Sequence, residues 1–547
     1  MSTEPPELSV VIPTFNRRER VRTGLQALER QTQYPTSFEV VVADDGSSDG
    51  TSDMVESMET PLRLRALRLE NGGWTAAASA GAAAATAPIC LQIDDDVLAS
   101  PQLVAEHIAA HRGQAPTMAI GRLIQEPPRS DDWFVAAYTT AWNRRYDELA
   151  ERQADWRDAF GANFSAPTAL LRKAGRFVTD KPALADMELG YRLNLEGCVP
   201  VYLPRAEAVH DDEKDRARLL RDVAGFGGFA ATFAERHPET RSLLFGWYGQ
   251  AGPREAFLRQ ALLALRVPPA LLARLGDLLP GRDRKQLWYD FIARYSFWFA
   301  ARAAMSKRLW SETTRGVPVL MYHAFSDRGE EDRFIARKPA FERQLRLLKT
   351  LRYRPISLEQ LARTLAAGEP LPKRSFVITI DDGYRDNFEI ARPVLARMRI
   401  GATLFPVSGR LDDESGWGGS GANSGRPMLS AEQLREMAAD GFEVGAHTRT
   451  HPHLPELPAA ASAEEIAGSR ADLEAVLGTP VRTFAYPYGE LAEETVTAVG
   501  AAGFEAACTT ESRLARAGDD PLRIPRLEVM GSDGTRKFLR KLWFGGF

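Results

Sequence analysis

Two acidic clusters in the first half of the chain have the side chains best suited to hold a metal. Asp44 and Asp45 follow the run FEVVVA, and Asp94, Asp95 and Asp96 follow ICLQI. Carboxylate oxygens are the ligands that Mg²⁺ and Mn²⁺ prefer. The D-x-D spacing of Asp94 and Asp96 lets both face one divalent cation, which could neutralise a departing diphosphate. A lone D-x-D is also common in solvated acidic turns, so its spacing alone leaves both interpretations open.

The second half contains histidines and carboxylates of a different type of site. His447 and His451 are four residues apart in HTRTHP, and Asp381 and Asp382 end the run SFVITI. Zn²⁺ with His and Asp ligands and an open position activates water and polarises a carbonyl, and a second carboxylate can take the proton from water. Such a set can hydrolyse an N-acetyl group. The H-x-x-x-H spacing is weak alone, but the segments TIDDG and FAYPYG accompany it.

Strands and helices alternate around the acidic clusters of the first half. We expect strands at LSVVIPTF, FEVVVADD, RLRALRLE and ICLQIDDD, and helices at residues 18–31, 51–58 and 76–87. This alternation predicts a mainly parallel sheet with helices on both faces. Ligands bind at the carboxyl ends of strands in such sheets, and both clusters fall there.

The remainder divides into a connector and a second α/β region. Residues 234–316 are rich in Arg, Leu and Ala and are expected to be helical. From residue 317, the strand candidates VPVLMYH, SFVITIDDG, ATLFPV, FEVGAHT and VRTFAYP alternate with helices, which favours a β/α barrel. The Gly- and Ser-rich residues 412–426 are expected to form a mobile loop. We therefore expect an α/β protein with domains at 1–233 and 317–547, joined by the connector 234–316.

The order of motifs over residues 8–212 resembles glycosyltransferase family 2, the inverting GT-A class. These motifs are VVIPTFNR, VVADDGSSDGT, LQIDDDV, GANFSAPTALLRKAGRF and DMELGYRL. The resemblance implies a Rossmann-like mixed sheet, a nucleotide-sugar donor and a Mn²⁺ or Mg²⁺ ion. By this resemblance the nucleotide and its diphosphate would be bound by Pro13, Thr14, Asp44, Asp45, Asp94 and Asp95, and the metal by Asp94, Asp96 and His210.

Asp186, in DMELGYRL, would be the catalytic base that deprotonates the acceptor hydroxyl. Family members often have Glu before this Asp, whereas Ala185 stands there in this chain, and Glu188 is an alternative base. His210 taken alone also fits an ordinary surface histidine.

TIDDG, HTRTHP and FAYPYG together resemble the polysaccharide deacetylases, carbohydrate esterase family 4, over residues 317–530. The resemblance implies that Asp382, His447 and His451 bind Zn²⁺ or a similar ion and that Asp381 is the base. Tyr488 would contribute to the oxyanion site through its backbone N–H. Tyr486 and Pro487 would shape the sugar groove.

Two departures from this pattern concern the base and the acid. Many members have an Arg just before the Pro-Tyr of the third motif, where Tyr486 stands here, and Arg526 is the candidate substitute. Many members also supply the general acid as a His near the end of the domain, but no histidine follows His453. A subset that resembles exopolysaccharide-processing deacetylases places this His in a Met-Tyr-His segment, which makes His323 in VPVLMYHAF the candidate acid. A buried strand-end histidine is the alternative interpretation of His323, and His453 is a weaker candidate acid.

Composition narrows the class of protein. The net charge of −4 gives no reason to expect nucleic acid as a partner. The three cysteines, Cys90, Cys198 and Cys508, form no C-x-x-C pair, which excludes a cysteine zinc cluster and favours a reducing compartment. Without a signal-like start or an apolar run long enough to span a bilayer, a cytoplasmic location is expected. The aromatic, basic residues 286–310 and the tail 534–547 are candidates for peripheral contact with the inner membrane face, with packed helices as the alternative.

These observations predict a bifunctional carbohydrate enzyme. One site would transfer a sugar from a nucleotide-sugar to a glycan or lipid-linked acceptor with inversion, and the other would remove the acetyl group of an N-acetylated sugar with the help of a metal. One alternative is a transferase with a catalytically silent, glycan-binding deacetylase-like domain. Another is a scaffold for glycan synthesis at a membrane.

Overall fold

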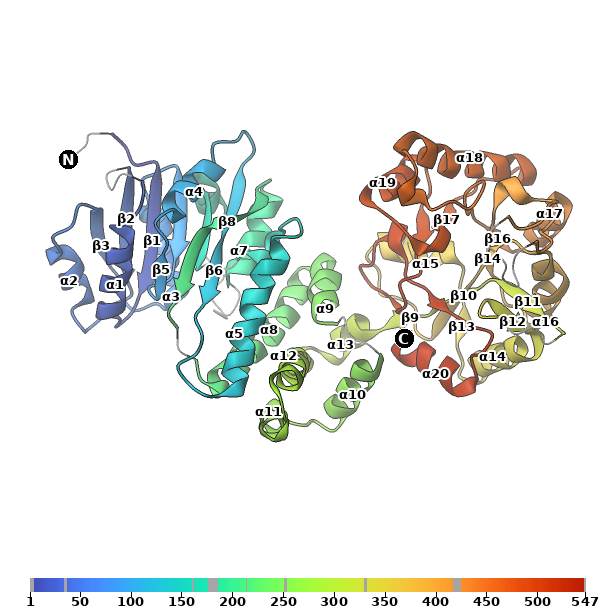
Figure 1. Ribbon diagram of the computed structural model, residues 1–547, viewed down its shortest axis with the longest axis horizontal. Helices are drawn as coiled ribbons and strands as arrows, with labels where there is room; N and C mark the ends of the chain where they lie inside the picture. The colour runs from blue at the N-terminus through green and yellow to red at the C-terminus, as the bar shows by residue number, and fades with distance from the viewer. Residues whose placement is uncertain are drawn as a thin grey trace. The chain divides into compact units, whose positions relative to one another are not determined.

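The computed structural model describes residues 4–33, 37–159, 162–175, 185–212, 214–249, 253–328, 332–416 and 425–545. The chain divides into two compact units (Figure 1). The first contains Met1–Phe233 and Arg266–Ala304, and the second contains Ala234–Leu265 and Met305–Phe547. The helices of residues 234–316 are therefore shared between both units. Residues 417–424 of the expected 412–426 loop lie outside the described part, as do 161 and 176–177 of one family motif and 546–547 of the tail.

The first unit is built on a mixed sheet with the strand order β3-β2-β1-β4-β7-β6-β8-β5. Its parallel half consists of β1 (Leu8–Thr14), β2 (Phe38–Asp44), β3 (Arg63–Arg68) and β4 (Ile89–Ile93). The antiparallel β7 (Asn163–Pro167) joins β4 to the other half, which consists of β6 (Thr117–Gln125), β8 (Val199–His210) and β5 (Val97–Ala99). The predicted α/β class and mixed sheet are confirmed.

Helices cover the central strands of this sheet on both faces, which explains why β1 and β2 are buried along their whole length. The covering helices include α1 (Arg18–Leu28), α2 (Thr51–Ser57), α3 (Trp74–Ala84) and α4 (Leu103–Ala110). The small residues of α3 allow close packing, since a Cβ at Gly81 would lie 2.4 Å from Cγ1 of Val11. This rigid centre fixes the strand ends at which the acidic clusters lie.

A helical layer completes the first unit. It contains α5 (Trp133–Leu149), α6 (Thr168–Ala174), α7 (Ala185–Leu195), α8 (Arg216–Arg236), α11 (Pro269–Leu275) and α12 (Arg282–Ala304). The aromatic side chains of α12 are largely buried, and Tyr289 packs edge-on against Phe134 of α5 with ring centroids 4.9 Å apart. Residues 286–304 are therefore mainly packing residues of this unit. Among the described residues, no helix is long and apolar enough to cross a membrane.

The second unit contains short parallel strands. The main sheet has the order β16-β15-β14-β10-β20, formed by Glu443–Val444, Thr403–Pro406, Ser375–Asp382, Val319–Tyr322 and Leu527–Glu528. β17 (Thr483–Ala485) and β18 (Ala506–Cys508) form a parallel pair. Single parallel bridges join Ala446 to Phe484 and Cys508 to Ile524. These parallel pairings and bridges therefore connect neighbouring segments in a circuit, from β10 through β14, β15, β16, β17 and β18 to β20, which pairs with β10 again.

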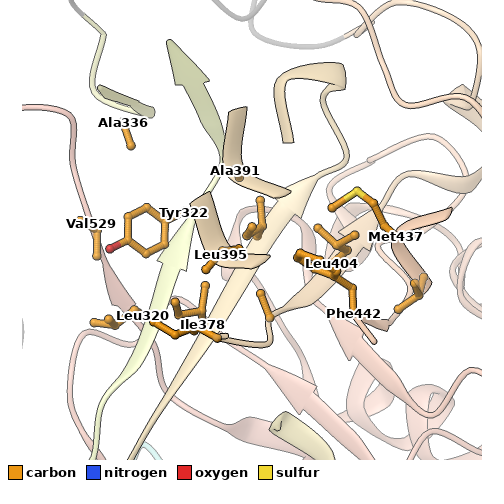
Figure 2. Packing of buried hydrophobic residues seen from close by; sticks show 14 of the residues in the cluster. Leu320, Tyr322, Ala336, Ile378, Ala391, Leu395, Leu404, Met437, Phe442 and Val529 are labelled. Atoms are coloured by element: carbon orange, nitrogen blue, oxygen red, sulfur yellow. The ribbon is translucent and has the colours of Figure 1, made fainter. Parts of the chain in front are cut away.

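Helices surround these strands and form the core with them. They are α14 (Lys338–Thr350), α15 (Leu358–Ala366), α16 (Arg392–Met398), α17 (Ala431–Ala439), α18 (Ala459–Leu477), α19 (Glu493–Ala501) and α20 (Thr535–Phe544). The second unit also contains α9 (Arg241–Gly249), α10 (Pro253–Ala264) and α13 (Lys307–Thr314). Figure 2 shows Leu320 and Ile378 of adjacent strands close to Leu395 of α16. In the tail, Phe538 and Leu542 of α20 are buried in the same core. This packing holds the end of β14, which contains Asp381 and Asp382.

Candidate active sites

The acidic clusters of the first unit line a cleft of about 550 Å³. Strands β1, β2 and β4 all end at this edge, as the parallel arrangement predicts. The residues singled out from the sequence that line the cleft are Pro13, Thr14, Asp45, Asp94, Asp95, Asp96 and His210.

Asp94, Asp96 and His210 have one potential ligand atom each within 4.8 Å of one another. Antiparallel pairing of β5 with β8 sets Val97 opposite His210, which brings the imidazole to Asp96. The Nε2 atom of His210 lies 3.2 Å from Oδ1 of Asp96, and the side-chain amide of Gln125 contacts Nδ1 at 2.7 Å. Two carboxylates and one imidazole form a donor set that fits a divalent cation.

Burial and neighbouring negative charges raise the pKa of Asp94 to about 7, with Asp96 and Asp186 as the largest of these charges. Burial also disfavours ionised Asp96, but His210 and Arg17 outweigh this effect and lower the pKa of Asp96 to about 2. A bound cation would relieve the repulsion that Asp94 experiences.

Two arginines that the sequence analysis did not assign contact the cluster. Nη1 of Arg17 lies 2.7 Å from Oδ1 of Asp95 and 2.8 Å from Oδ2 of Asp96, and Nη1 of Arg20 lies 3.2 Å from Asp96. Thr14 donates its hydroxyl to Asp95 at 2.7 Å. The basic run NRRER, which begins shortly after the end of β1, could have indicated these two arginines. The run starts at the edge of the sheet where the acidic residues lie.

The two carboxylates of the DDGS segment have different roles. Asp45 lines the cleft and accepts hydrogen bonds from the backbone N–H groups of Gly72 and Gly73, both at 2.8 Å. Asp44 does not line the cleft. It accepts from the backbone N–H of Ser47 at 2.9 Å and from the hydroxyl of Ser52, so it holds the turn between β2 and α2.

The candidate base Asp186 stands in the first turn of α7, outside the cleft lining. Its charge acts on the pKa of Asp94, so the two carboxylates are near each other. Glu188, the alternative base, is buried and forms a two-point ion pair with Arg192 at 2.9 and 2.7 Å. This pairing favours Asp186.

In the second unit, a pocket of about 530 Å³ is lined by eight of the residues singled out from the sequence, namely His323, Asp381, Asp382, His447, His451, Tyr486, Tyr488 and Arg526. Asp382, His447 and His451 are buried, and Oδ1 of Asp382 lies 3.7 and 3.6 Å from the Nε2 atoms of the two histidines. The Nδ1–H group of His447 donates to the carbonyl of Ala485 at 2.7 Å, which leaves Nε2 as a potential ligand. Three converging protein ligands beside an open pocket match the donor set of a catalytic zinc site.

The backbone around these ligands is unusual. Asp382, Thr448 and His451 have φ values of 71°, 66° and 62°, in the left-handed region that side-chain-bearing residues seldom adopt. The N–H of His451 donates to the hydroxyl of Thr448 at 3.0 Å, which holds this turn. Non-glycine residues in this conformation concentrate at functional sites.

Arg526 holds the candidate base Asp381. Its Nη1 and Nη2 atoms donate to the two carboxylate oxygens at 2.6 and 2.7 Å, and both side chains are buried. Arg526 also donates to the hydroxyl of Thr379 and to the carbonyl of Thr509. Burial disfavours ionised Asp381, but the charges of Arg526 and His447 outweigh it and lower the pKa of Asp381.

His323 lines the same pocket and packs edge-on against Phe334, with ring centroids 4.9 Å apart. It influences the pKa values of both Asp381 and His451, so it is near the base and a ligand. His453 does not line the pocket, but stacks on Tyr488 at 3.9 Å and contacts Glu490 at 2.8 Å.

Tyr488 lines the pocket with a left-handed backbone, φ 59°. Tyr486 also lines the pocket, and its ring is buried with its hydroxyl donating to the carbonyl of Leu522 at 3.1 Å.

Comparison with known proteins gives two family matches. Residues 9–172 match the family described as glycosyl transferase family 2, and residues 368–507 match polysaccharide deacetylase. The validoxylamine A glucosyltransferase of Streptomyces hygroscopicus subsp. limoneus is 34% identical over 272 residues, 44% of this chain, and the match covers 59% of that relative. The poly-beta-1,6-N-acetyl-D-glucosamine N-deacetylase of Staphylococcus aureus is 26% identical over 40% of this chain and 76% of its own length. The solved structure of IcaB from Ammonifex degensii is 28% identical, with a TM-score of 0.37 and coverage of 42% of this chain and 96% of IcaB.

Proposed function

We propose that this chain, in which residues 9–172 belong to glycosyl transferase family 2 and residues 368–507 to the polysaccharide deacetylases, has two catalytic activities. The first is inverting transfer of a sugar from a nucleotide-sugar to a glycan or lipid-linked acceptor. The second is hydrolysis of the acetamide of an N-acetylated sugar.

In the transfer site, the residues around the cleft have distinct tasks. Asp94, Asp96 and His210 would hold a Mn²⁺ or Mg²⁺ ion, whose chemistry is to neutralise the departing diphosphate. Pro13, Thr14 and Asp45 would line the nucleotide pocket. Asp186 would take the proton of the acceptor hydroxyl while the oxygen of that hydroxyl attacks the anomeric carbon.

Arg17 would orient Asp95 and Asp96 and favour their ionised forms, against the burial that raises the pKa of Asp95, and Arg20 would do the same for Asp96. Both guanidinium groups are partly exposed, so their charge also favours an approaching anionic donor.

In the deacetylation site, Asp382, His447 and His451 would hold Zn²⁺ or a similar ion, whose chemistry is Lewis-acid polarisation of the acetyl carbonyl and of water. Asp381 would take a proton from the attacking water, with Arg526 fixing its orientation. His323 would protonate the amine nitrogen as the C–N bond breaks, which yields acetate and a free amino sugar. The backbone N–H of Tyr488 would stabilise the negative charge that develops on the acetyl oxygen.

The observation that carries the second activity is the buried Arg526–Asp381 pair beside the triad Asp382, His447 and His451. A pocket that only binds glycan does not need a carboxylate that stays ionised although it is buried. It also does not need three potential metal ligands that converge beside that carboxylate. The relative named as an N-deacetylase of poly-beta-1,6-N-acetyl-D-glucosamine supports an N-acetylglucosamine-containing substrate. The relative named as a validoxylamine A glucosyltransferase supports sugar transfer by the first unit.

The test is to incubate the whole chain with labelled nucleotide-sugars and acceptors, and to measure label transfer and acetate release separately. We expect chelation to abolish both activities, Mn²⁺ to restore transfer and Zn²⁺ to restore acetate release. A His447→Ala/His451→Ala variant should lose bound zinc and acetate release but retain transfer. His453→Ala is the matched control, because it removes a histidine of the same segment that is not a potential ligand.

Transfer without acetate release from any N-acetylated glycan would support the glycan-binding alternative. Loss of both activities in His447→Ala/His451→Ala, in a folded protein, would contradict two independent sites.

A further inference from the structure

An unusual group of exposed leucines lies on the helical layer of the first unit. Leu271 and Leu275 belong to α11, Leu278 to the short helix η3 (Gly276–Leu278), and Leu287 to the start of α12. They are 50, 46, 81 and 70% exposed, respectively. We call these four residues the leucine face. Large apolar side chains that gather on a surface mark sites of interaction with other molecules or membranes.

The spacing of the three leucines of α11 and η3 places them on one side of that helical segment, and Leu287 is exposed on the neighbouring α12. Leu271, Leu275 and Leu278 follow the i, i+4, i+7 pattern of a single helix face. The opposite side packs against the unit, where Leu272, Ala273 and Gly276 are buried. This packing is tight, since a Cβ at Gly276 would lie 2.1 Å from Cζ2 of Trp133. The leucine face therefore lies outside the side of this segment that the fold buries.

Basic residues accompany the leucine face. Residues 266–287 contain five basic side chains and two acidic ones, whereas the whole chain has a net charge of −4. Of the two acids, Asp277 already accepts hydrogen bonds from Trp133 and contacts Arg216. The basic residues, of which all but the partly buried Lys285 are exposed, are Arg266, Arg274, Arg282, Arg284 and Lys285.

We propose that the leucine face and its basic neighbours dock the chain on the surface of an anionic lipid bilayer. Exposed leucines beside arginines match the two attractions that such a surface offers, burial of apolar side chains at the headgroup boundary and attraction to anionic lipid. A second copy of the chain fits less well, because a two-fold interface would set these basic side chains against themselves. This contact goes beyond the two proposed activities and does not depend on either.

The experiment is co-sedimentation of the full chain with vesicles. We expect binding to vesicles of phosphatidylglycerol and phosphatidylcholine in equal parts, little binding to phosphatidylcholine alone, and release by salt. Leu278→Glu/Leu287→Glu should reduce binding at least tenfold. Arg282→Gln/Arg284→Gln should reduce it about 25-fold, at about fivefold for each basic side chain near an anionic surface.

Leu195→Glu is the matched control, because Leu195 is 66% exposed at the end of α7 and lies outside the leucine face. It introduces the same negatively charged side chain, once instead of twice, and should bind vesicles as the original chain does. Circular dichroism and transfer to a water-soluble acceptor should be unchanged in all three variants, which separates lost docking from lost folding.

Absence of binding to the anionic vesicles, or equal loss in Leu195→Glu, would overturn the proposal. It would also be overturned if Leu278→Glu/Leu287→Glu only changed the sedimenting mass of the protein without vesicles, since the leucine face would then join two copies of the chain.

Discussion

Replacing Arg526 with Met tests whether this residue positions and ionises the base of the deacetylation site. Arg526 forms two charge-assisted hydrogen bonds to Asp381 inside the protein, at 2.6 and 2.7 Å. Removing one partner of a buried ion pair typically costs about 3–5 kcal/mol, because the remaining charge is left uncompensated. We expect Arg526→Met to lower the free energy of unfolding of the second unit by an amount in this range. Acetate release should fall about 10²–10⁴-fold, the usual contribution of a general base.

The pH dependence gives the more specific readout. Arg526 is the largest of the influences that lower the pKa of Asp381, whereas burial acts in the opposite direction. Without Arg526, burial dominates and the pKa rises, so the acid limb of the acetate-release profile should move to higher pH. The loss of stability should be greatest above this raised pKa and should shrink as the pH falls through it, because the folded protein then takes up the proton that relieves the buried charge.

Two further variants separate positioning from general damage to the core. Arg526→Lys keeps a positive charge but not the two-point geometry, so it should retain more stability than activity. Thr379→Val removes one other partner of Arg526 at almost constant volume and should leave the acid limb in place. If Arg526→Met unfolds at the same denaturant concentration as the original chain and keeps the same acid limb, the proposed role of Arg526 is wrong.

Three other substitutions test separate parts of the structure. His323→Gln should abolish acetate release but leave zinc content and sugar transfer unchanged, which metal analysis and the two activity assays can check. Asp186→Asn should abolish transfer while a nucleotide-sugar in Mn²⁺ still protects the first unit from thermal unfolding. Burial raises the pKa of Glu443 to about 7, so ionised Glu443 destabilises the fold above its unfolded pKa, and this effect is relieved as the pH falls through about 7. Glu443→Gln should therefore stabilise the second unit at pH 8 by about 3 kcal/mol, at 1.36 kcal/mol per pKa unit, and by less near pH 5, as measured by denaturant unfolding.

The strands and the places of both sites could be predicted from the sequence because both depend on local patterns. LSVVIPT and FEVVVAD, within two of the expected runs, became fully buried strands, since helices cover both faces of the sheet. The carboxyl ends of parallel strands lie at one edge of the sheet. The convergence of the acidic clusters that follow these strands could therefore be predicted without knowledge of long-range contacts.

Side-chain partners were harder to predict because they depend on strand order and register. His210 reaches Asp96 only because β5 pairs antiparallel with β8. Asp44 and Asp45 are adjacent in the sequence, yet one holds a turn and the other faces the cleft. Arg17 and Arg20 stand in a helix start that sequence alone presents as an ordinary basic surface.

The missing Arg of the third deacetylase motif shows how topology can change the functional interpretation of a sequence. A search for motifs finds Tyr486 where that Arg is expected, which favours a silent domain. The segment that contains Arg526, however, pairs with a neighbour on each side. Ile524 pairs with Cys508, and β20 pairs with β10. This double pairing carries Arg526 to the inner side of the sheet, within hydrogen-bond distance of Asp381. The same charge therefore reaches the same kind of base from a different strand, and the departure in sequence is a poor argument against catalysis.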